Sequence, residues 1–305
     1  MMVSTRKNIL ATIAYYDVLE YPLTFFEVRK YLLNYHNFSE KGEVSIFEVQ
    51  QKLTELANSG FVGSYKGFFF LLGKKHLVDE RIFREKISII KLKRMRRLIA
   101  LLRYIPFVRM IAATGSLSFR HGTRGSDWDM LVVLEEKALF TGRFLLTAFL
   151  QVIGKRRHGK KIADRACLNY FTGSESLTVR LQDWYSSHEY QVMVPFFQTF
   201  SQDAFYRSNG WMTDFRAQMK LPVTANRLQI KDTQKTLRTR TFLEKIFFHP
   251  KLERRLAAWQ RKKIAKNPQT AAKGACIIAD EHSLVFFPHP RGPKVFEKFQ
   301  KRLSF

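Results

Sequence analysis

Two aspartates separated by a single residue, Asp127 and Asp129, begin an apolar run in the sequence SDWDMLVV. Side chains alternate between the two faces of a β-strand, so a strand here presents both carboxylates on one face and Trp128 on the other, toward the core. In proteins, Mg²⁺ is bound by one or two carboxylates together with substrate phosphates. We therefore expect Asp127 and Asp129 to be metal ligands.

A glycine and a serine, Gly115 and Ser116, lie at the end of the preceding apolar stretch, FVRMIAAT. Glycine lets a backbone approach phosphate oxygens closely, and serine adds a hydroxyl and a backbone N–H as donors. Ser116 precedes Asp127 by eleven positions, which is enough for one or two helical turns and a loop. This loop carries residues that we expect to screen the charge of a triphosphate: Arg120, His121 and Arg124.

The combination of ATGS and SDWDMLVV, flanked by apolar strands, resembles the signature of the nucleotidyltransferase superfamily of DNA polymerase β type. It is most similar to the small members of that superfamily, whose motif reads GS followed by SDxDLLV. The resemblance covers residues 108–171. The whole layout also resembles a bacterial group of such proteins in which a winged helix precedes the nucleotidyltransferase core and helices follow it.

The resemblance implies an activity and a set of site residues. An NTP, ATP by family analogy, would donate a nucleotidyl group to a hydroxyl of an acceptor that the sequence does not identify. Mg²⁺ held by Asp127 and Asp129 would lower the pKa of the acceptor hydroxyl and neutralise charge on the leaving pyrophosphate. The residues that it assigns to nucleotide binding are Gly115, Ser116, Arg124 and Ser126.

One position departs from the family pattern. A third carboxylate is expected in a later strand, and the corresponding strand here reads CLNYF, with Asn169 at the catalytic position. A neutral amide binds a metal more weakly than a carboxylate and cannot act as a base at pH 7. Asp164 and Glu175 flank the strand without matching the position. A degenerate protein that binds RNA or a protein partner without catalysis is therefore the alternative.

The N-terminal sequence predicts helices followed by a hairpin, the order of a winged helix-turn-helix. Thr24 with Glu27, and Ser45 with a glutamate three residues on, predict two helix starts. A turn at Lys66-Gly67 predicts the hairpin. A DNA-binding regulator is thus a further hypothesis for the function of the chain. The third helix argues against it, because it carries two glutamates and a single lysine, Lys52, where groove-reading helices need cations.

The remaining pattern predicts an α+β protein in which a mixed sheet of nucleotidyltransferase type is flanked by helices. A long basic helix precedes the sheet, residues 181–200 are predicted helical, and two basic helices, a hairpin and a short helix end the chain. The hairpin segment FFPHP is interpreted as core and turn, not as a site. The predicted domains are a winged helix over 1–80, the nucleotidyltransferase domain over 81–200 and a basic, mainly helical region over 201–305.

Charge is distributed unevenly along this strongly basic chain, which has a formal net charge of +26. Residues 221–305 contain 19 basic and 6 acidic residues, and this excess predicts RNA or another polyanion as a partner. In the segment HPKLERRLAAWQRKKIAK, the apolar stripe through Leu252, Leu256 and Trp259 is predicted to face the core.

No apolar stretch is long enough for a transmembrane segment. Two isolated cysteines without a signal peptide predict a cytoplasmic protein with free thiols.

Overall fold

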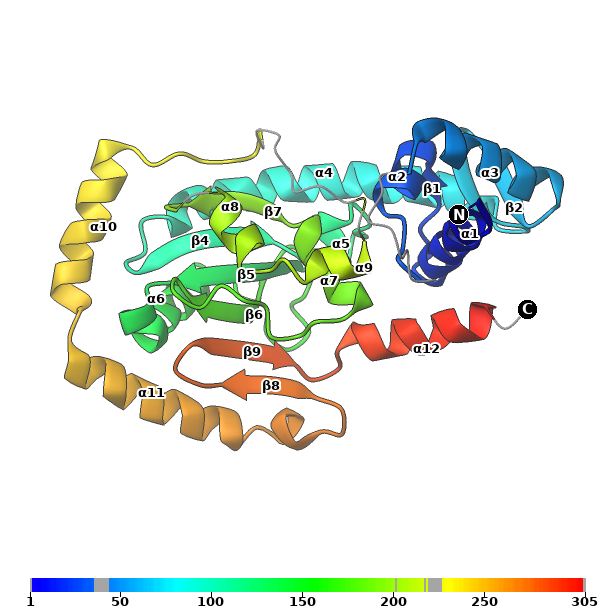
Figure 1. Cartoon of the computed structure of the whole chain (residues 1–305). Helices are drawn as coiled ribbons and strands as arrows, with labels where there is room; N and C mark the ends of the chain where they lie inside the picture. The colour runs from blue at the N-terminus through cyan, green and yellow to red at the C-terminus, as the bar shows by residue number, and fades with distance from the viewer. Residues whose placement is uncertain (1, 36–43, 201, 217, 219–226, 304–305) are drawn as a thin grey trace.

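The computed structural model describes residues 2–35, 44–200, 202–216, 218 and 227–303. Over these residues the chain has a mixed α/β fold with a three-stranded sheet near its N-terminus and a six-stranded sheet at its centre (Figure 1). Among the described helices, none has both the length and the apolar character that crossing a membrane requires.

The N-terminal part consists of three helices and a small antiparallel sheet with strand order β1-β3-β2. The predicted capping box is confirmed, because the Thr24 hydroxyl accepts a hydrogen bond from the Glu27 backbone and the Glu27 carboxylate accepts one from the Thr24 backbone. Lys66 and Gly67 both have positive φ, 50° and 78°, and form the predicted hairpin turn. The elements are α1 (Met2–Val18), β1 (Leu23–Thr24), α2 (Phe25–Lys30), α3 (Ile46–Asn58), β2 (Val62–Tyr65) and β3 (Phe68–Leu71).

The central sheet is mixed and has the strand order β7-β4-β5-β6-β9-β8. Strands β5 and β6 are parallel, and the other neighbouring pairs are antiparallel. Helix α6 (Leu139–Val152) provides the crossover that a parallel pair needs. The strands are β4 (Val108–Ala113), β5 (Trp128–Leu134), β6 (Ala166–Gly173), β7 (Val194–Gln198), β8 (Cys276–Ala279) and β9 (Ser283–Phe287).

Helices cover both faces of this sheet, so its central strand β5 is apolar on both sides. Met130 and Val132 pack with the long helix α4 (His76–Leu102) and with α6. Leu131 and Val133 point to the opposite face, where they join a second cluster. That cluster includes residues of α7 (Trp184–Gln191), α8 (Gln202–Arg207) and α9 (Met212–Phe215). This packing holds the start of β5 in a fixed position.

The expectation of one helix over residues 181–200 is wrong in its second half. Helix α7 ends at Gln191, and β7 then pairs with β4 as an edge strand of the central sheet. Phe196 and Phe197 are both fully buried and belong to the same core cluster, which suits a strand covered by the surrounding helices. Pro195 is tolerated because an edge strand leaves one row of backbone N–H groups unpaired.

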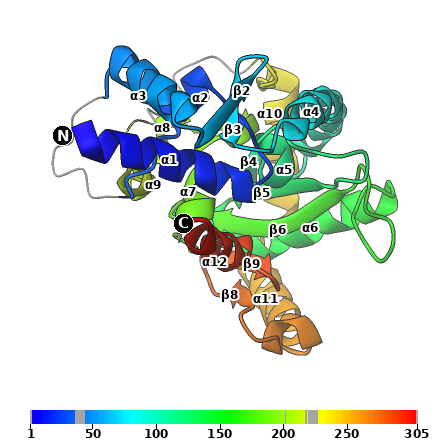
Figure 2. The same ribbon diagram turned by 90° about the vertical axis from the view of Figure 1, so that its right-hand side faces the viewer.

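The C-terminal part of the chain packs against both the central sheet and the N-terminal helices. Helices α10 (Gln234–Phe247) and α11 (Pro250–Ala265) lie at one end of the central sheet, as Figure 1 shows. The hairpin β8–β9 then extends that sheet, and α12 (Arg291–Leu303) packs against α1 (Figure 2). Phe299 of α12 is fully buried in the N-terminal core. Short 3₁₀ helices span Glu136–Ala138 and Pro268–Ala271.

The predicted apolar stripe of α11 is wrong at two of its three residues, because Leu252 is 37% exposed and Trp259 is exposed as well. Trp259 is 50% exposed and contacts only the edge of the Phe144 ring among the described aromatic residues. Helix α11 packs against α6, and this contact buries the face through Leu256 and Gln260. The Gln260 side chain donates to the Phe140 carbonyl at 2.8 Å. A buried glutamine with a backbone partner therefore occupies the stripe where an apolar residue was expected.

Candidate functional site

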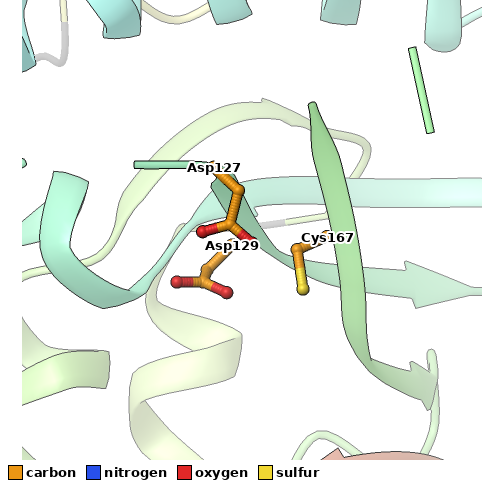
Figure 3. A group of neighbouring side chains, drawn as sticks. All are labelled: Asp127, Asp129 and Cys167. Carbon is orange, nitrogen blue, oxygen red and sulfur yellow. The ribbon is translucent and has the colours of Figure 1, made fainter. Parts of the chain in front are cut away.

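The two aspartates of SDWD lie at the start of β5, at the edge of a cavity of about 290 Å³. Asp127 immediately precedes the strand and Asp129 is its second residue, and both line the cavity (Figure 3). Trp128 between them is 2% exposed and belongs to the core. The alternation predicted from the sequence thus places both carboxylates on the cavity side.

Gly115 forms the floor of this site. It begins the single helical turn α5 (Gly115–Ser118) that follows β4, and its φ of +61° lies in the left-handed region that favours glycine. A Cβ atom on Gly115 would lie 2.2 Å from the Asp129 Oδ2 atom. No other residue type fits here without displacing that carboxylate.

A third acid, Glu189 of α7, reaches the same turn. The Gly115 backbone N–H donates to Glu189 Oε1 at 2.7 Å, and Glu189 lines the cavity. Burial raises the pKa of Glu189 to about 8, and the nearby charge of Asp129 adds to the effect. The sequence offered no signal for this residue, because 74 positions separate it from its partner and the His188-Glu189 pair lacks the second histidine of an HExxH zinc motif.

Strand β6 contributes two side chains to the cavity, Cys167 and Asn169. The Asn169 amide donates to Asp129 Oδ1 at 2.9 Å. Cys167 lies directly opposite Asp129 in the parallel register, and a β-bulge follows this pair. One ligand atom from each of Asp127, Asp129 and Cys167 lies within 4.8 Å of the others, so these three residues form a group that could hold a metal ion. Burial, together with the charges of the aspartates, raises the pKa of the Cys167 thiol to about 12.

An arginine bridges part of this group. Arg157, in the loop before β6, places its Nη1 atom 2.6 Å from Asp127 Oδ2 and 3.3 Å from Cys167 Sγ. Asp129 interacts with the Asn169 amide and the Cys167 thiol, and burial followed by the charge of Asp127 raises its pKa to about 6. The site therefore combines two carboxylates, one of them protonated part of the time near neutral pH, with a cation already in contact.

The end of β9, the loop after it and the start of α12 form one wall of the cavity. Phe286 to Gly292 line it, including Arg291, whose guanidinium donates to the Tyr185 hydroxyl at 3.4 Å. The interpretation of FFPHP as core and turn is incomplete, because this segment also forms a wall of the cavity. It reaches the site because β9 pairs with β6, a neighbourhood that no local sequence pattern encodes.

Three other residues assigned to nucleotide binding do not belong to the described lining of the cavity. The Ser116 carbonyl accepts from the His121 backbone at 2.8 Å. The Arg124 guanidinium lies 5.7 Å from the centre of the Phe83 ring. The Ser126 carbonyl accepts from the Lys91 ammonium at 2.7 Å and thereby ties the loop to α4.

The remaining loop residues also point elsewhere. The His121 ring contacts Arg84 and Tyr21, and burial, followed by the charge of Arg84, lowers its pKa to about 3. A neutral imidazole does not screen a triphosphate. Asp164, one of the two acids flanking β6, pairs with Lys91 at 2.9 Å and supports the same loop. The other, Glu175, is absent from the described cavity lining.

The arrangement can hold a divalent cation between carboxylate oxygens and a thiol, beside a backbone turn and basic side chains that suit an anionic ligand. Comparison of the chain with protein-family models, curated proteins and solved structures gives no match. The chemistry of the site must therefore be argued from its own residues.

Proposed function

We propose that this chain is a metal-dependent nucleotidyltransferase that moves a nucleotidyl group from an NTP, in the first instance ATP, to a hydroxyl of an acceptor. One observation carries the proposal: the Gly115 turn lies directly against Asp129, beside Asp127, on the wall of one cavity. The connection of antiparallel β4 and β5 through a one-turn helix, with β6 parallel to β5, supports a nucleotidyltransferase type of sheet.

The donor set fits a divalent cation. Asp127 and Asp129 supply the oxygen ligands that Mg²⁺ prefers, and the cavity leaves space beside them for phosphates. When bound, the metal would supply charge neutralisation and acidify the acceptor hydroxyl. Arg291, which lines the same cavity, would bind phosphate oxygens. The Gly115 N–H is available to phosphate only when Glu189 releases it.

The N-terminal part is proposed to be a winged helix that contacts protein. Its order of helices and strands, and its sheet order β1-β3-β2, support that architecture. The single lysine of α3, Lys52, is buried and forms an ion pair with Glu55 at 2.8 Å. A DNA-reading helix needs free cations on its exposed face, so the observation disfavours the DNA-binding alternative.

A non-catalytic nucleotide-binding protein is the second candidate function. Two observations favour it: Asn169 replaces the third acid beside Asp129, and Arg157 is paired with Asp127. Both contacts reduce the negative charge available to metals. In this case the cavity would bind a nucleotide or the end of an RNA without transfer.

The test uses the purified full chain with each of the four labelled NTPs, Mg²⁺ or Mn²⁺, and fractionated cell extract. Label transferred to one fraction, and lost in the Asp127→Asn/Asp129→Asn double variant, supports nucleotidyl transfer. Metal-dependent NTP binding by calorimetry without any transfer supports the non-catalytic candidate. If none of the four NTPs binds in the presence of either metal, both candidate functions are contradicted.

A further inference from the structure

We propose that Cys167 is the third metal ligand of this site and that the site consequently selects a thiophilic divalent cation, Zn²⁺ or Co²⁺, over Mg²⁺. The inference concerns the metal site of the proposed function and rests on that proposal only for the role of the bound ion. Its geometric basis is independent, because it comes from the register of β5 and β6.

The first observation is the position of the sulfur atom. Cys167 pairs directly with Asp129 across the parallel strands, and its side chain lies beside both carboxylates (Figure 3). Oxygen and sulfur ligands lie about 2.0–2.3 Å from Zn²⁺, and in its usual tetrahedral geometry two ligands of one ion are therefore about 3.3–3.8 Å apart. The three ligand atoms here lie within 4.8 Å of one another, so small side-chain rotations bring them to one ion.

The second observation is a cation already present between two of the ligands. The Arg157 guanidinium contacts both Asp127 Oδ2, at 2.6 Å, and Cys167 Sγ, at 3.3 Å. Arg157 is half exposed and belongs to a loop, so a metal ion can displace it toward solvent. The guanidinium thus marks the position of a metal between carboxylate and sulfur.

The third observation is a buried oxygen without a partner. The Asn169 Oδ1 atom has no hydrogen-bond donor among the described residues, and Asn169 lines the same cavity. An amide oxygen of this kind accepts a hydrogen bond from a water bound to the metal, or binds the metal itself. The donor set then consists of two carboxylates and one sulfur, with the amide oxygen as an acceptor for a water on the metal.

Sulfur changes the choice of metal. A thiolate is a soft ligand that favours Zn²⁺ and related transition metals, whereas Mg²⁺ requires oxygen ligands and near-ideal octahedral geometry. The thiol releases its proton to solvent when the metal–sulfur bond forms. Where a third carboxylate would favour Mg²⁺, Cys167 favours the softer ions.

The test is a titration of the full chain with Co²⁺, followed by absorption spectroscopy. We expect the near-ultraviolet charge-transfer band of a cobalt–thiolate bond in the unmodified protein. Cys167→Ser should abolish the band and weaken Co²⁺ and Zn²⁺ binding by roughly 10-fold or more. Cys276→Ser is the control and should change neither the band nor the affinities. Arg157→Gln should tighten Co²⁺ binding, because it removes the competing cation.

Absence of the thiolate band in the unmodified protein at saturating Co²⁺ overturns the inference, whatever the variants do. Unchanged Co²⁺ and Zn²⁺ affinity in a folded Cys167→Ser variant overturns it as well. The proposed function fails separately: a thiolate band without NTP binding removes the nucleotidyltransferase proposal and leaves the metal ligand in place. Mg²⁺-supported transfer without a thiolate band removes Cys167 as a metal ligand and leaves the nucleotidyltransferase proposal in place.

Discussion

The backbone N–H of Gly115 donates a 2.7 Å hydrogen bond to the carboxyl group of Glu189, so an acid of the protein occupies the turn proposed to receive phosphate. Glu189 is 8% exposed and lies near the charge of Asp129. An anionic ligand at this turn has to compete with the acid, and the protonation state of Glu189 decides how strongly.

Replacement of Glu189 by glutamine should therefore change the dependence of stability on pH. Burial raises the pKa of Glu189 to about 8 from an ordinary value of 4.5, so between these values the folded state holds a proton that the unfolded state has lost. Stability consequently falls as pH rises through this window, by roughly 1.4 kcal/mol for each pKa unit of difference between the states. The glutamine of Glu189→Gln still accepts a hydrogen bond from the Gly115 N–H but does not ionise. The variant should therefore lack this loss of stability at rising pH.

The measurement is urea unfolding of both proteins at pH 5, 6, 7 and 8 in the presence of a chelator. The free energy of unfolding of Glu189→Gln, relative to that of the unmodified protein, should increase with pH. Glu297→Gln, at an exposed position beside Lys301, is the control and should leave the pH profile unchanged within error. Parallel profiles for the unmodified protein and Glu189→Gln would show that the buried acid is already ionised.

Gly115→Ala tests the close approach of the turn to Asp129. A residue with Cβ at positive φ costs of order 1–3 kcal/mol, and here the added Cβ would also meet Asp129 Oδ2 at 2.2 Å. We expect a loss of stability together with a loss of metal affinity. Gly60→Ala is the matched control, since Gly60 has a similar φ of +74° and no atom within 4 Å of the added Cβ.

Thermal unfolding and Co²⁺ titration of the two variants separate the backbone effect from the contact. Gly60→Ala should lose stability alone. Equal losses in the two variants, with metal binding intact in Gly115→Ala, would mean that Asp129 moves aside at no cost and that the approach has no role in the site.

The local features of this chain were predictable because they depend on neighbouring residues. The Thr24–Glu27 capping box and the Lys66-Gly67 turn are fixed by side chains and dihedral angles within a few positions. The same holds for Asp127 and Asp129, whose common orientation follows from strand alternation around the buried Trp128. The pair of carboxylates that lines the cavity was thus predictable from the sequence.

The rest of the site depends on which strands become neighbours. Glu189 reaches Gly115 from α7, and the segment from Phe286 to Gly292 lines the cavity because β9 pairs with β6. Cys167 became a candidate only once the register placed it opposite Asp129, two residues before the predicted Asn169. The strand β7 was missed because an apolar run buried on both faces lacks the period that distinguishes strand from helix.

Asp127→Asn and Asp129→Asn should each abolish metal-dependent nucleotide binding or transfer while the fold survives. Each change removes a charged metal ligand and keeps the side-chain shape, so affinity should fall by more than roughly 100-fold, beyond the loss seen for residues that only orient ligands. Asp203→Asn, on the exposed surface of α8, is the control. Near-unmodified metal binding in both site variants would remove these residues from the site.

Asn169→Asp should restore the third acid and strengthen metal binding. Without metal it places a carboxylate where the amide now donates to Asp129 Oδ1 at 2.9 Å, so the variant should be less stable than the unmodified protein in chelator. Added metal should then raise its unfolding temperature more than that of the unmodified protein. A metal-induced shift no larger than in the unmodified protein would show that position 169 is not a ligand position.

The cationic face of α11 should bind single-stranded RNA. Its exposed cations include Lys251, Arg254, Arg255 and Lys262, whereas Arg261 is tied to Glu281 at 2.9 Å. Each phosphate contact releases counterions and contributes about −0.7 to the slope of log affinity against log salt. Half-exposed Trp259 adds a surface on which a base can stack.

The change to test is glutamine at these four exposed positions of α11, with labelled RNA titrated at several salt concentrations. Affinity at low salt should fall, and the slope should become shallower by up to about 3 units, the sum of four contacts. The matched control removes the same charge elsewhere, at the exposed residues Lys7, Lys86, Lys93 and Arg97. If both quadruple variants lose affinity equally, the attraction comes from the net charge of the whole chain, and α11 is a solvated surface. If the α11 variant alone loses affinity, this helix is the RNA-binding surface.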